Sequence, residues 1–319
     1  MRKPRYLSPT SIDKFYSDRD EFYLMYLADE RPPRMPQTQP MAIGSAFDAY
    51  VKSYLIEKLF GDKCFDKMFE QMVEPQNRDW AIEEGKYVFE HYRECGKLAS
   101  LMLELERAVE EPRFEFTVEA RVAHETCVDG VPLLGKPDVF FKTKDDGHVI
   151  YDWKVNGYCS KSNKSPAQGY IDCDGKMHKK CQPMIVGGLR VNRGMPFEHV
   201  DERWATQTTI YGWVLGEPVG GDTIIGIDQI CAWGAKRDAQ DRPKLRVATH
   251  RGLATPAWQH ALMAKIAYVW QAIQSPETVF ADMMTADQSR DKCICLDSVH
   301  KIYESADPRD AWIASMRKA

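Results

Sequence analysis

Three charged residues in the middle of the chain carry the clearest chemical signal: Asp138, Asp152 and Lys154. Asp152 and Lys154 are two residues apart in a segment with strand-like alternation, so both side chains leave the same face of that strand. Asp138 lies in the other strand of a predicted hairpin, which turns at 144–147. Two neighbouring carboxylates form a hard oxygen site suited to Mg²⁺ or Mn²⁺, and an adjacent lysine can hold a water molecule or stabilise charge on a phosphate. This combination is typical of metal-assisted phosphodiester hydrolysis.

The elements that must position these residues follow from the spacing of the apolar residues. Alternation predicts strands over 114–118, 131–141, 149–155, 223–233 and 244–250. Helical periods predict helices that begin near Ser8 and Gly44, and helical segments over 22–27, 77–111, 202–215 and 256–274. The proline-rich segment 31–40 predicts a loop. The order of the core, helix, three strands, helix, strand, predicts an α/β fold with a central mixed sheet.

We expect a single domain over residues 1–319. Its parts are a helical N-terminal part (1–111), a catalytic core (112–233) and a C-terminal strand with helices (234–319). The segment 156–200 is rich in Gly, Lys, Ser, Cys and Pro and has little periodicity, which predicts a long insertion directly after the strand that carries Lys154. Long loops in compact domains are usually functional.

Four parts of the chain resemble elements of the PD-(D/E)XK nuclease superfamily. They are FYSDRDEFYLMYL (15–27), GSAFD (44–48), PD (137–138) with DWK (152–154), and QTTIY (207–211). QTTIY resembles the QxxxY motif of the RecB-like branch, and GSAFD resembles its GxxxH element with Asp48 at the histidine position. The resemblance covers roughly residues 8–233. It implies a restriction-endonuclease-like αβββαβ core with N-terminal helices.

The resemblance also implies roles for individual residues. Asp138 and Asp152 would bind the metal ion, and Lys154 would orient or assist the attacking water. Gln207 and Tyr211 would help to hold the active site and the nucleic acid.

Two further carboxylates have two interpretations each. Asp48 is a third metal ligand, since an aspartate can also bind Mg²⁺, or it is an exposed helix carboxylate beside Lys52. Glu119 lies in the first core strand, where many relatives carry an acidic residue, and is either a ligand or positioning group or an ordinary strand carboxylate.

The charge of the chain is unevenly distributed. Its 43 basic and 47 acidic residues give a formal net charge of −4, which argues against a general nucleic-acid coat. The insertion is nevertheless basic, and so is 234–252, which suits contact with a polyanion along one face. Solvated loops would give the same pattern. The lysines that we expect to contact nucleic-acid phosphates are Lys161, Lys164, Lys176, Lys179 and Lys180.

The cysteines do not predict a metal cofactor of their own. Some relatives hold an iron–sulfur cluster, but Ser17 stands about where their first cysteine would fall, and only Cys293 and Cys295 are paired late in the chain. No iron–sulfur cluster is therefore expected. Four soft ligands fall within the insertion at spacings unlike those of a zinc finger, so structural zinc is not expected there: Cys159, Cys173, His178 and Cys181.

These features together predict a cytoplasmic DNA nuclease. No apolar run is long enough to cross a membrane, no signal peptide is visible, and the scattered cysteines suit a reducing compartment, in the host cytoplasm if the chain is virus-encoded. The resemblance favours an exonuclease of DNA recombination, repair or replication, as found in phages and mobile elements. Its partners would be DNA and a single-strand annealing or other recombination or replication protein. A sequence- or structure-specific DNA endonuclease, a non-catalytic DNA-binding or scaffold protein on the same fold, and the oligomeric state stay open.

Overall fold

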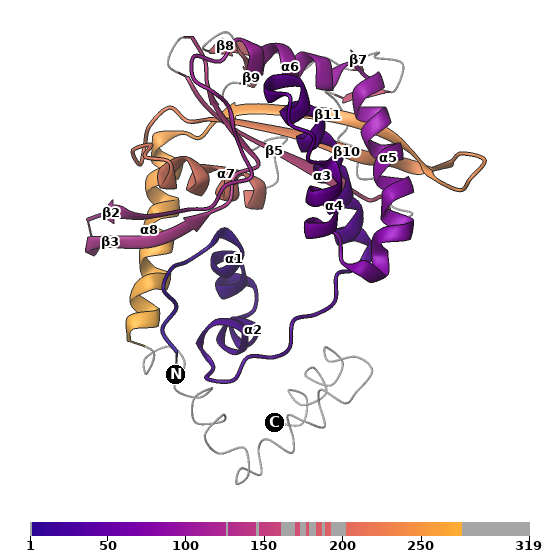
Figure 1. Cartoon of the computed structure of the whole chain (residues 1–319). Helices are drawn as coiled ribbons and strands as arrows, with labels where there is room; N and C mark the ends of the chain where they lie inside the picture. Colours follow the sequence, from indigo (N-terminus) through magenta and orange to yellow (C-terminus); the bar gives the residue numbers. More distant parts are fainter. Residues whose placement is uncertain are drawn as a thin grey trace. The chain divides into compact units, whose positions relative to one another are not determined.

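The computed structural model describes residues 2–125, 127–144, 147–160, 170–172, 177–178, 183–186, 189–192 and 202–275 (Figure 1). These residues divide into two compact units. The larger comprises 5–13 and 33–267, and the smaller comprises, of the described residues, 2–4, 14–32 and 268–275. That the two form the single domain expected from the sequence stays a prediction. The candidate residues whose side chains are described all lie in the larger unit.

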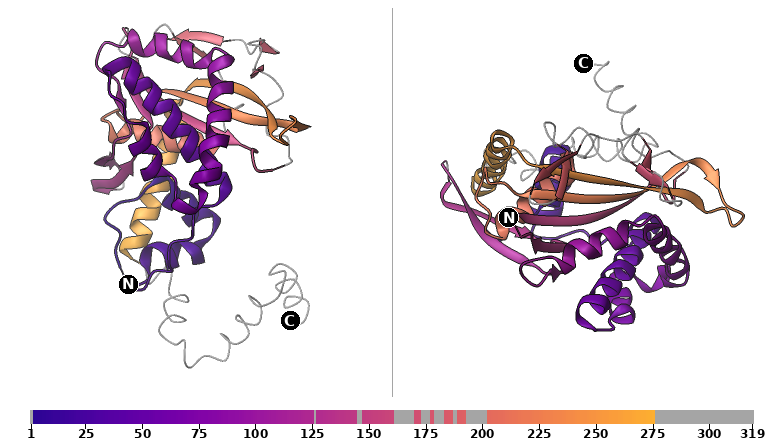
Figure 2. Two further views of the ribbon diagram at one scale, coloured as in Figure 1. Left: turned by 45° about the vertical axis from the view of Figure 1, so that its right-hand side comes forward. Right: turned by 90° about the horizontal axis from the view of Figure 1, so that it is seen from above.

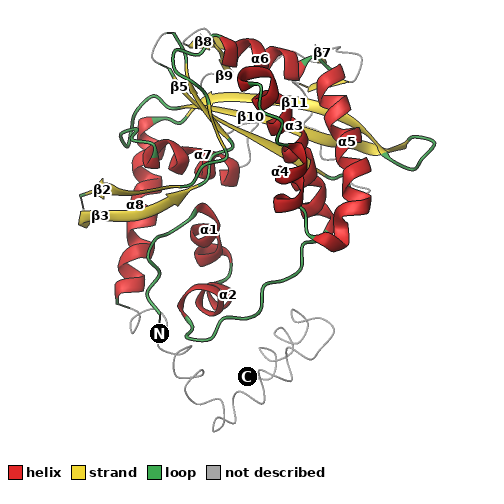
Figure 3. Cartoon of the chain, viewed as in Figure 1, coloured by secondary structure: helices red, strands yellow, loops and turns green. Residues whose placement is uncertain are grey.

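The larger unit is built on a mixed sheet of seven strands, which confirms the α/β class (Figure 3). Its order is β1 (Arg113–Phe114), β4 (Val139–Lys142), β5 (His148–Asn156), β10 (Ile224–Arg237), β11 (Pro243–Leu253), β6 (Tyr170–Asp172) and β7 (Met177–His178). The central pair β5 and β10 is parallel, and every other neighbouring pair is antiparallel. Two hairpins stand outside this sheet, β2 (Val118–His124) with β3 (Cys127–Gly135) and β8 (Pro183–Val186) with β9 (Leu189–Asn192).

The helices account for most of the remaining described residues. They are α1 (Pro9–Ser17), α2 (Arg19–Phe22), the π-helical η1 (Tyr23–Leu27), α3 (Gln39–Phe60), α4 (Phe65–Met72), the 3₁₀-helical η2 (Pro75–Asn77), α5 (Arg78–Glu94), α6 (Lys97–Glu106), α7 (Glu202–Val214) and α8 (Pro256–Gln274). None of the helices in the described part of the chain has the length and apolarity that spanning a bilayer requires.

Helices cover both faces of the central sheet. Along β10, Ile224 and Ile230 belong to the core cluster that α3, α5 and α6 share with β4, β5 and β11. Ile225 and Ile227 point the other way and pack with Ala205 of α7. Since successive side chains of a strand leave opposite faces, α7 lies across the sheet from α3, α5 and α6 (Figure 2). A strand buried on both sides needs a continuous apolar run, which explains the sequence Ile-Ile-Gly-Ile of β10.

Helix α3 is held in place by its ends and by a close contact. A proline in its first turn favours its start, and Gly61 ends it in the left-handed conformation, at φ 82°. Gly85 of α5 lies so close that a Cβ placed on it would be 2.6 Å from the Cβ of Ala46. The small residues at this crossing therefore fix α3 against α5, and with it the two charged residues Asp48 and Lys52.

Several elements differ from their prediction. Helix α3 begins at Gln39 instead of Gly44, and the predicted helix 77–111 is two helices, which Gly96 separates at φ 83°. The predicted strand 131–141 is interrupted by 136–138, because Pro137 has no N–H to donate to a ladder. The chain thereby leaves the β2–β3 hairpin and joins the central sheet as β4. The predicted insertion 156–200 contains β6 to β9, and β6 extends the central sheet beside β11.

In the smaller unit, the N-terminal helical segment folds on an aromatic contact. The rings of Phe15 and Phe22 meet edge to face with centroids 5.2 Å apart. Asp18 begins the next helix by accepting a hydrogen bond from the N–H of Glu21 at 2.9 Å. The predicted helical run 22–27 is a π-helical turn.

Candidate active site

The β4–β5 hairpin brings the two predicted metal ligands level with each other. Asp138 directly precedes β4, and the register pairs the next residue, Val139, with Tyr151. Asp138 therefore reaches the sheet opposite Asp152. The prediction placed Asp138 inside a strand, whereas the structure places it at the entry to one. Asp152 is 2% exposed.

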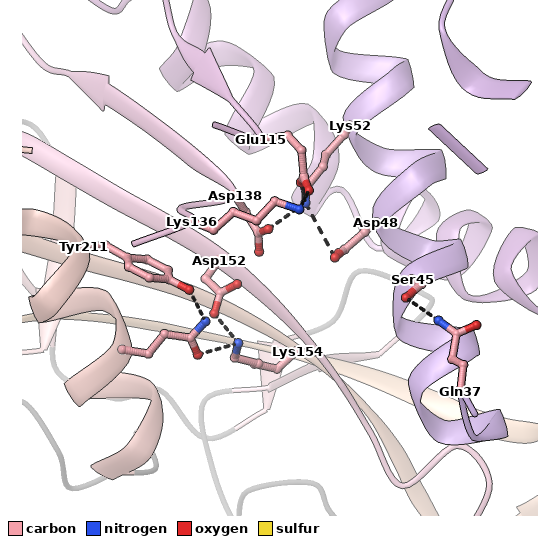
Figure 4. Close-up of polar contacts among 11 residues, drawn as sticks. Gln37, Ser45, Asp48, Lys52, Glu115, Lys136, Asp138, Asp152, Lys154 and Tyr211 are labelled. Carbon is pink, nitrogen blue, oxygen red and sulfur yellow. Dashed lines mark hydrogen bonds and ion pairs between the residues drawn. The ribbon is translucent and has the colours of Figure 1, made fainter. Parts of the chain in front are cut away.

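Lys154 joins the sheet to helix α7 (Figure 4). Its ammonium group forms an ion pair with Asp152 Oδ2 and donates a hydrogen bond to Gln207 Oε1 at 3.0 Å. Gln207 in turn donates from Nε2 to the hydroxyl oxygen of Tyr211 at 2.8 Å. Residues four apart share one face of a helix, so the QTTIY segment presents both side chains to the strand. The structure thus brings Asp138, Asp152, Lys154, Gln207 and Tyr211 together; their roles in catalysis stay a prediction.

A glycine lets α7 approach this closely. A Cβ on Gly135, at the end of β3, would be 2.7 Å from Val214 Cγ2 and 2.9 Å from Tyr211 Cδ1. Contacts that short do not occur between real Cβ atoms and their neighbours, so a larger residue would push the helix away. Gly135 therefore helps to set the distance between the Tyr211 ring and the strand.

A second charged cluster lies on the α3 side of Asp138 and was not expected. The Lys52 ammonium donates to Asp138 Oδ1 at 2.6 Å, contacts Glu115 Oε2, and lies 3.6 Å from Asp48 Oδ2. Lys136 forms an ion pair with the other carboxylate oxygen of Glu115. Asp48 is thus no exposed helix residue, since its side chain is 22% exposed and faces Lys52.

Sequence reasoning missed Glu115 and the buried position of Lys52. A weak signal existed for Lys52, which lies one turn after Asp48 and beside the apolar face formed by Phe47, Val51 and Leu55. No signal in the sequence pointed to Glu115. In the structure its φ of 44° lies in the left-handed region, which residues with side chains rarely adopt. Its N–H also donates to the carbonyl of Asp138 at 3.1 Å.

The two aspartates of the site differ in how readily they ionise. Burial raises the pKa of Asp138, but the ammonium groups of Lys52 and Lys154 and a hydrogen bond with Asp152 outweigh it and hold that pKa below its usual range. Burial, aided by the negative charge of Asp138, raises the pKa of Asp152 well above its ordinary value. Two adjacent carboxylates do not both ionise freely, so Asp138 ionises more readily than Asp152.

The neighbouring groups respond to the same environment. Burial raises the pKa of Asp48 to about 7, although the ammonium of Lys52 opposes the shift. Burial lowers the pKa of Lys154, but the carboxylates of Asp152 and Asp138 outweigh it and raise the pKa overall, so Lys154 is a cation. Burial raises the pKa of Tyr211 to about 12, so its hydroxyl is neutral at ordinary pH.

The donor chemistry fits a hard divalent cation. Asp138 and Asp152 offer only carboxylate oxygens, which Mg²⁺ and Mn²⁺ prefer. Asp152 Oδ2 is buried and accepts no properly formed hydrogen bond, despite its ion pair with Lys154. Within the described ranges, no group of three or more aspartate, glutamate, histidine or cysteine side chains is placed so that it could hold a metal ion. Lys52 and Lys154 contact the carboxylates of the site.

Other predicted residues lie elsewhere. Glu119 is in β2, which among the described strands pairs with β3 in a sheet separate from the central one, so its placement in the first core strand is corrected. Its carboxylate is 41% exposed and lies 3.1 Å from Arg5 Nη2, and no described contact links it to Asp138 or Asp152. The five predicted nucleic-acid lysines lie outside the described residues. Of the four soft ligands, Cys159 is exposed with a free thiol, and the side chains of the other three are outside the description.

Comparison with known proteins adds little. No family model matches the chain, and no curated protein matches it. Among solved structures, the chain is similar to the crystal structure of SSO0001, with 8% sequence identity, 82% of each chain covered and a TM-score of 0.26.

Proposed function

We propose that this chain is a Mg²⁺- or Mn²⁺-dependent deoxyribonuclease of the RecB-like PD-(D/E)XK class. One observation carries the proposal: Asp138 and Asp152 meet at the sheet while Lys154 is held between Asp152 and Gln207. Residues that are distant in sequence supply one acid pair, one partly buried cation and the groups that orient it. If Asp152 and Lys154 were a chance charge pair on a surface strand, we would not expect a side chain of helix α7 to hold Lys154.

Asp138 and Asp152 are the residues that would hold the metal ion. When bound, such an ion polarises a phosphate oxygen and lowers the pKa of a coordinated water. Lys154 lies beside this position and would hold the attacking water or neutralise charge that develops on the phosphate. Gln207 fixes the direction of the lysine, and Tyr211 fixes the amide of Gln207.

Exonuclease action on DNA in recombination, repair or replication is our preferred form of this proposal, from the resemblance of the motifs. The test incubates the full chain with linear, nicked and closed circular DNA, each with Mg²⁺, with Mn²⁺ and with EDTA. We expect metal-dependent loss of the linear DNA while the closed circle stays intact. Discrete products from the closed circle would instead indicate an endonuclease.

The matched control is Asp152→Asn, which keeps the size of the side chain but removes its charge. If linear DNA is lost equally in EDTA, or with Asp152→Asn, the proposal is wrong. DNA binding without cleavage in any metal would favour the non-catalytic alternative.

A further inference from the structure

Lys52 is the most unusual charged residue of the described chain. It lies on α3, one turn after Asp48, and is 1% exposed. Lysine is almost never fully buried unless it is paired, because removing an ammonium from water costs several kcal/mol that only well-placed opposite charges offset. Here three carboxylates surround it, those of Asp48, Glu115 and Asp138.

The backbone of Glu115 also adopts an unusual conformation where its side chain contacts Lys52. Glu115 adopts φ 44°, a strained conformation for a residue with a side chain, which persists only where surrounding contacts enforce it. The enforcing contacts are its ion pairs with Lys52 and Lys136 and its N–H bond to the carbonyl of Asp138. The chain therefore bends locally to bring a carboxylate onto Lys52.

The position of Lys52 bears directly on the site. Asp138 has a cation on each side of it, Lys52 toward α3 and Lys154 toward α7 (Figure 4). A second metal ion on the α3 side would need the same oxygens of Asp138, Glu115 and Asp48 that the ammonium now occupies. Two cations cannot share them without repulsion.

We propose that Lys52 is a built-in counter-ion which fills the place of a second metal ion, so that the site takes a single divalent ion at Asp138 and Asp152. This inference rests on the function proposed above and adds the number of ions. Asp48 then serves Lys52, and could act as a third ligand only if the ammonium moved away. Lys52 is a positioning residue, since it acts through the carboxylates.

The test is Mn²⁺ titration of the metal-free full chain by calorimetry, with thermal melting in EDTA and in Mn²⁺. We expect the parent to bind one ion. Lys52→Met removes the charge while keeping the length of the side chain, so it should bind two ions and melt lower in EDTA, with a larger gain in melting temperature on adding Mn²⁺ than the parent. Lys52→Arg, which restores a cation, should return to one ion.

Two controls separate this role from simple support of the fold. Lys136→Met removes a cation from the same Glu115 but from a position that is 58% exposed, and should still bind one ion. Asp48→Asn should bind one ion with the affinity of the parent, and it keeps the inference testable if Lys52→Met does not fold. A purely structural role for Lys52 would lower the melting temperature without changing the number of ions.

Two ions bound by the parent, a single ion bound by a folded Lys52→Met, or lost affinity in Asp48→Asn would each overturn the inference. The outcome is distinguishable from failure of the proposed function. Metal-dependent cleavage by a parent that binds two ions refutes the role of Lys52 alone. One bound ion without any DNA cleavage refutes the nuclease proposal alone.

Discussion

Gln207 offers the sharpest test of how the site is held together, because it joins two elements through its amide. Its Oε1 accepts from Lys154 at 3.0 Å, and its Nε2 donates to Tyr211 at 2.8 Å. Gln207→Leu removes both bonds and keeps a side chain of similar volume. Lys154 would then retain Asp152 as its only partner among the contacts described here.

The magnitude follows from the kinds of bond lost. A hydrogen bond to a charged group contributes about 1.5–3 kcal/mol, and each ~1.4 kcal/mol changes a rate tenfold. The Lys154 side chain is 20% exposed, so water can partly replace the amide and the lower part of that range applies. We expect kcat to fall about 10- to 30-fold with KM little changed, since the loss concerns the orientation of Lys154 rather than the binding of DNA.

Tyr211→Phe provides a graded comparison. It removes a neutral hydrogen bond, which contributes about 0.5–1.5 kcal/mol, so kcat should fall only about 2- to 10-fold. The tyrosine is neutral at ordinary pH, because burial raises its pKa to about 12. Its loss should therefore leave the pH profile of cleavage unchanged between roughly pH 6 and pH 9.

The assay is steady-state hydrolysis of a linear duplex in Mg²⁺, with melting curves to confirm folding. The matched control is Glu202→Gln, an exposed position in the first turn of the same helix, which should cleave at the parent rate. Parent-like kcat in Gln207→Leu would show that the amide does not orient Lys154. A larger fall in kcat for Tyr211→Phe than for Gln207→Leu would contradict the assumption that Tyr211 acts through Gln207.

Three further outcomes are expected. Asp152→Ala and Lys154→Ala should each abolish cleavage while circular dichroism and melting show a folded protein, since a deleted ligand removes several kcal/mol of charge stabilisation; a folded variant that cuts at the parent rate contradicts the assignment. Asp48→His should leave the Mg²⁺/Mn²⁺ activity ratio unchanged if Asp48 serves Lys52, whereas a shift toward Mn²⁺ would make position 48 a metal ligand, imidazole being the softer donor. Asp228→Asn should lower the free energy of unfolding in urea by about 2–4 kcal/mol, because the buried carboxylate accepts from the hydroxyls of Tyr92 at 2.6 Å, Tyr151 at 2.5 Å and Thr249 at 2.6 Å; an unchanged urea midpoint would mean that these bonds are readily replaced.

The elements that carry the site were predictable where one physical rule dominated. The predicted helix 202–215 is observed as α7 (Glu202–Val214), and the helix begun by Pro256 ends at Gln274 as expected. The predicted strand with Asp152 and Lys154 is observed as β5, although its burial does not alternate, since the consecutive residues 149–153 are all buried. That Gln207 and Tyr211 would lie at the site was implied by the resemblance to the QxxxY motif, and the contact of Gln207 with Lys154 is given by the structure alone.

The parts that were missed depend on tertiary contacts. Nothing in the alternation around 114–118 distinguishes Glu115 from Glu119, yet the first turns onto Lys52 and the second lies in a separate hairpin with Arg5. Glu115 directly follows β1, which pairs with β4 of the central sheet, whereas Glu119 lies in β2, which pairs with β3 in a separate sheet. Local periodicity in the sequence indicates that a segment is a strand, but it does not indicate which other strand the segment pairs with.

The balance of charge links the second cluster to the proposed chemistry. Asp48, Glu115, Asp138 and Asp152 would together repel one another in a site with little exposure to water. Lys52, Lys136 and Lys154 neutralise all but one formal charge, so the carboxylates can stay together while no metal ion is bound. One divalent ion would then reverse the sign of the site and make it attractive to a phosphodiester, whereas two would leave a surplus of positive charge beside buried ammonium groups. The same pairs that make the metal-free fold stable thus favour a single ion.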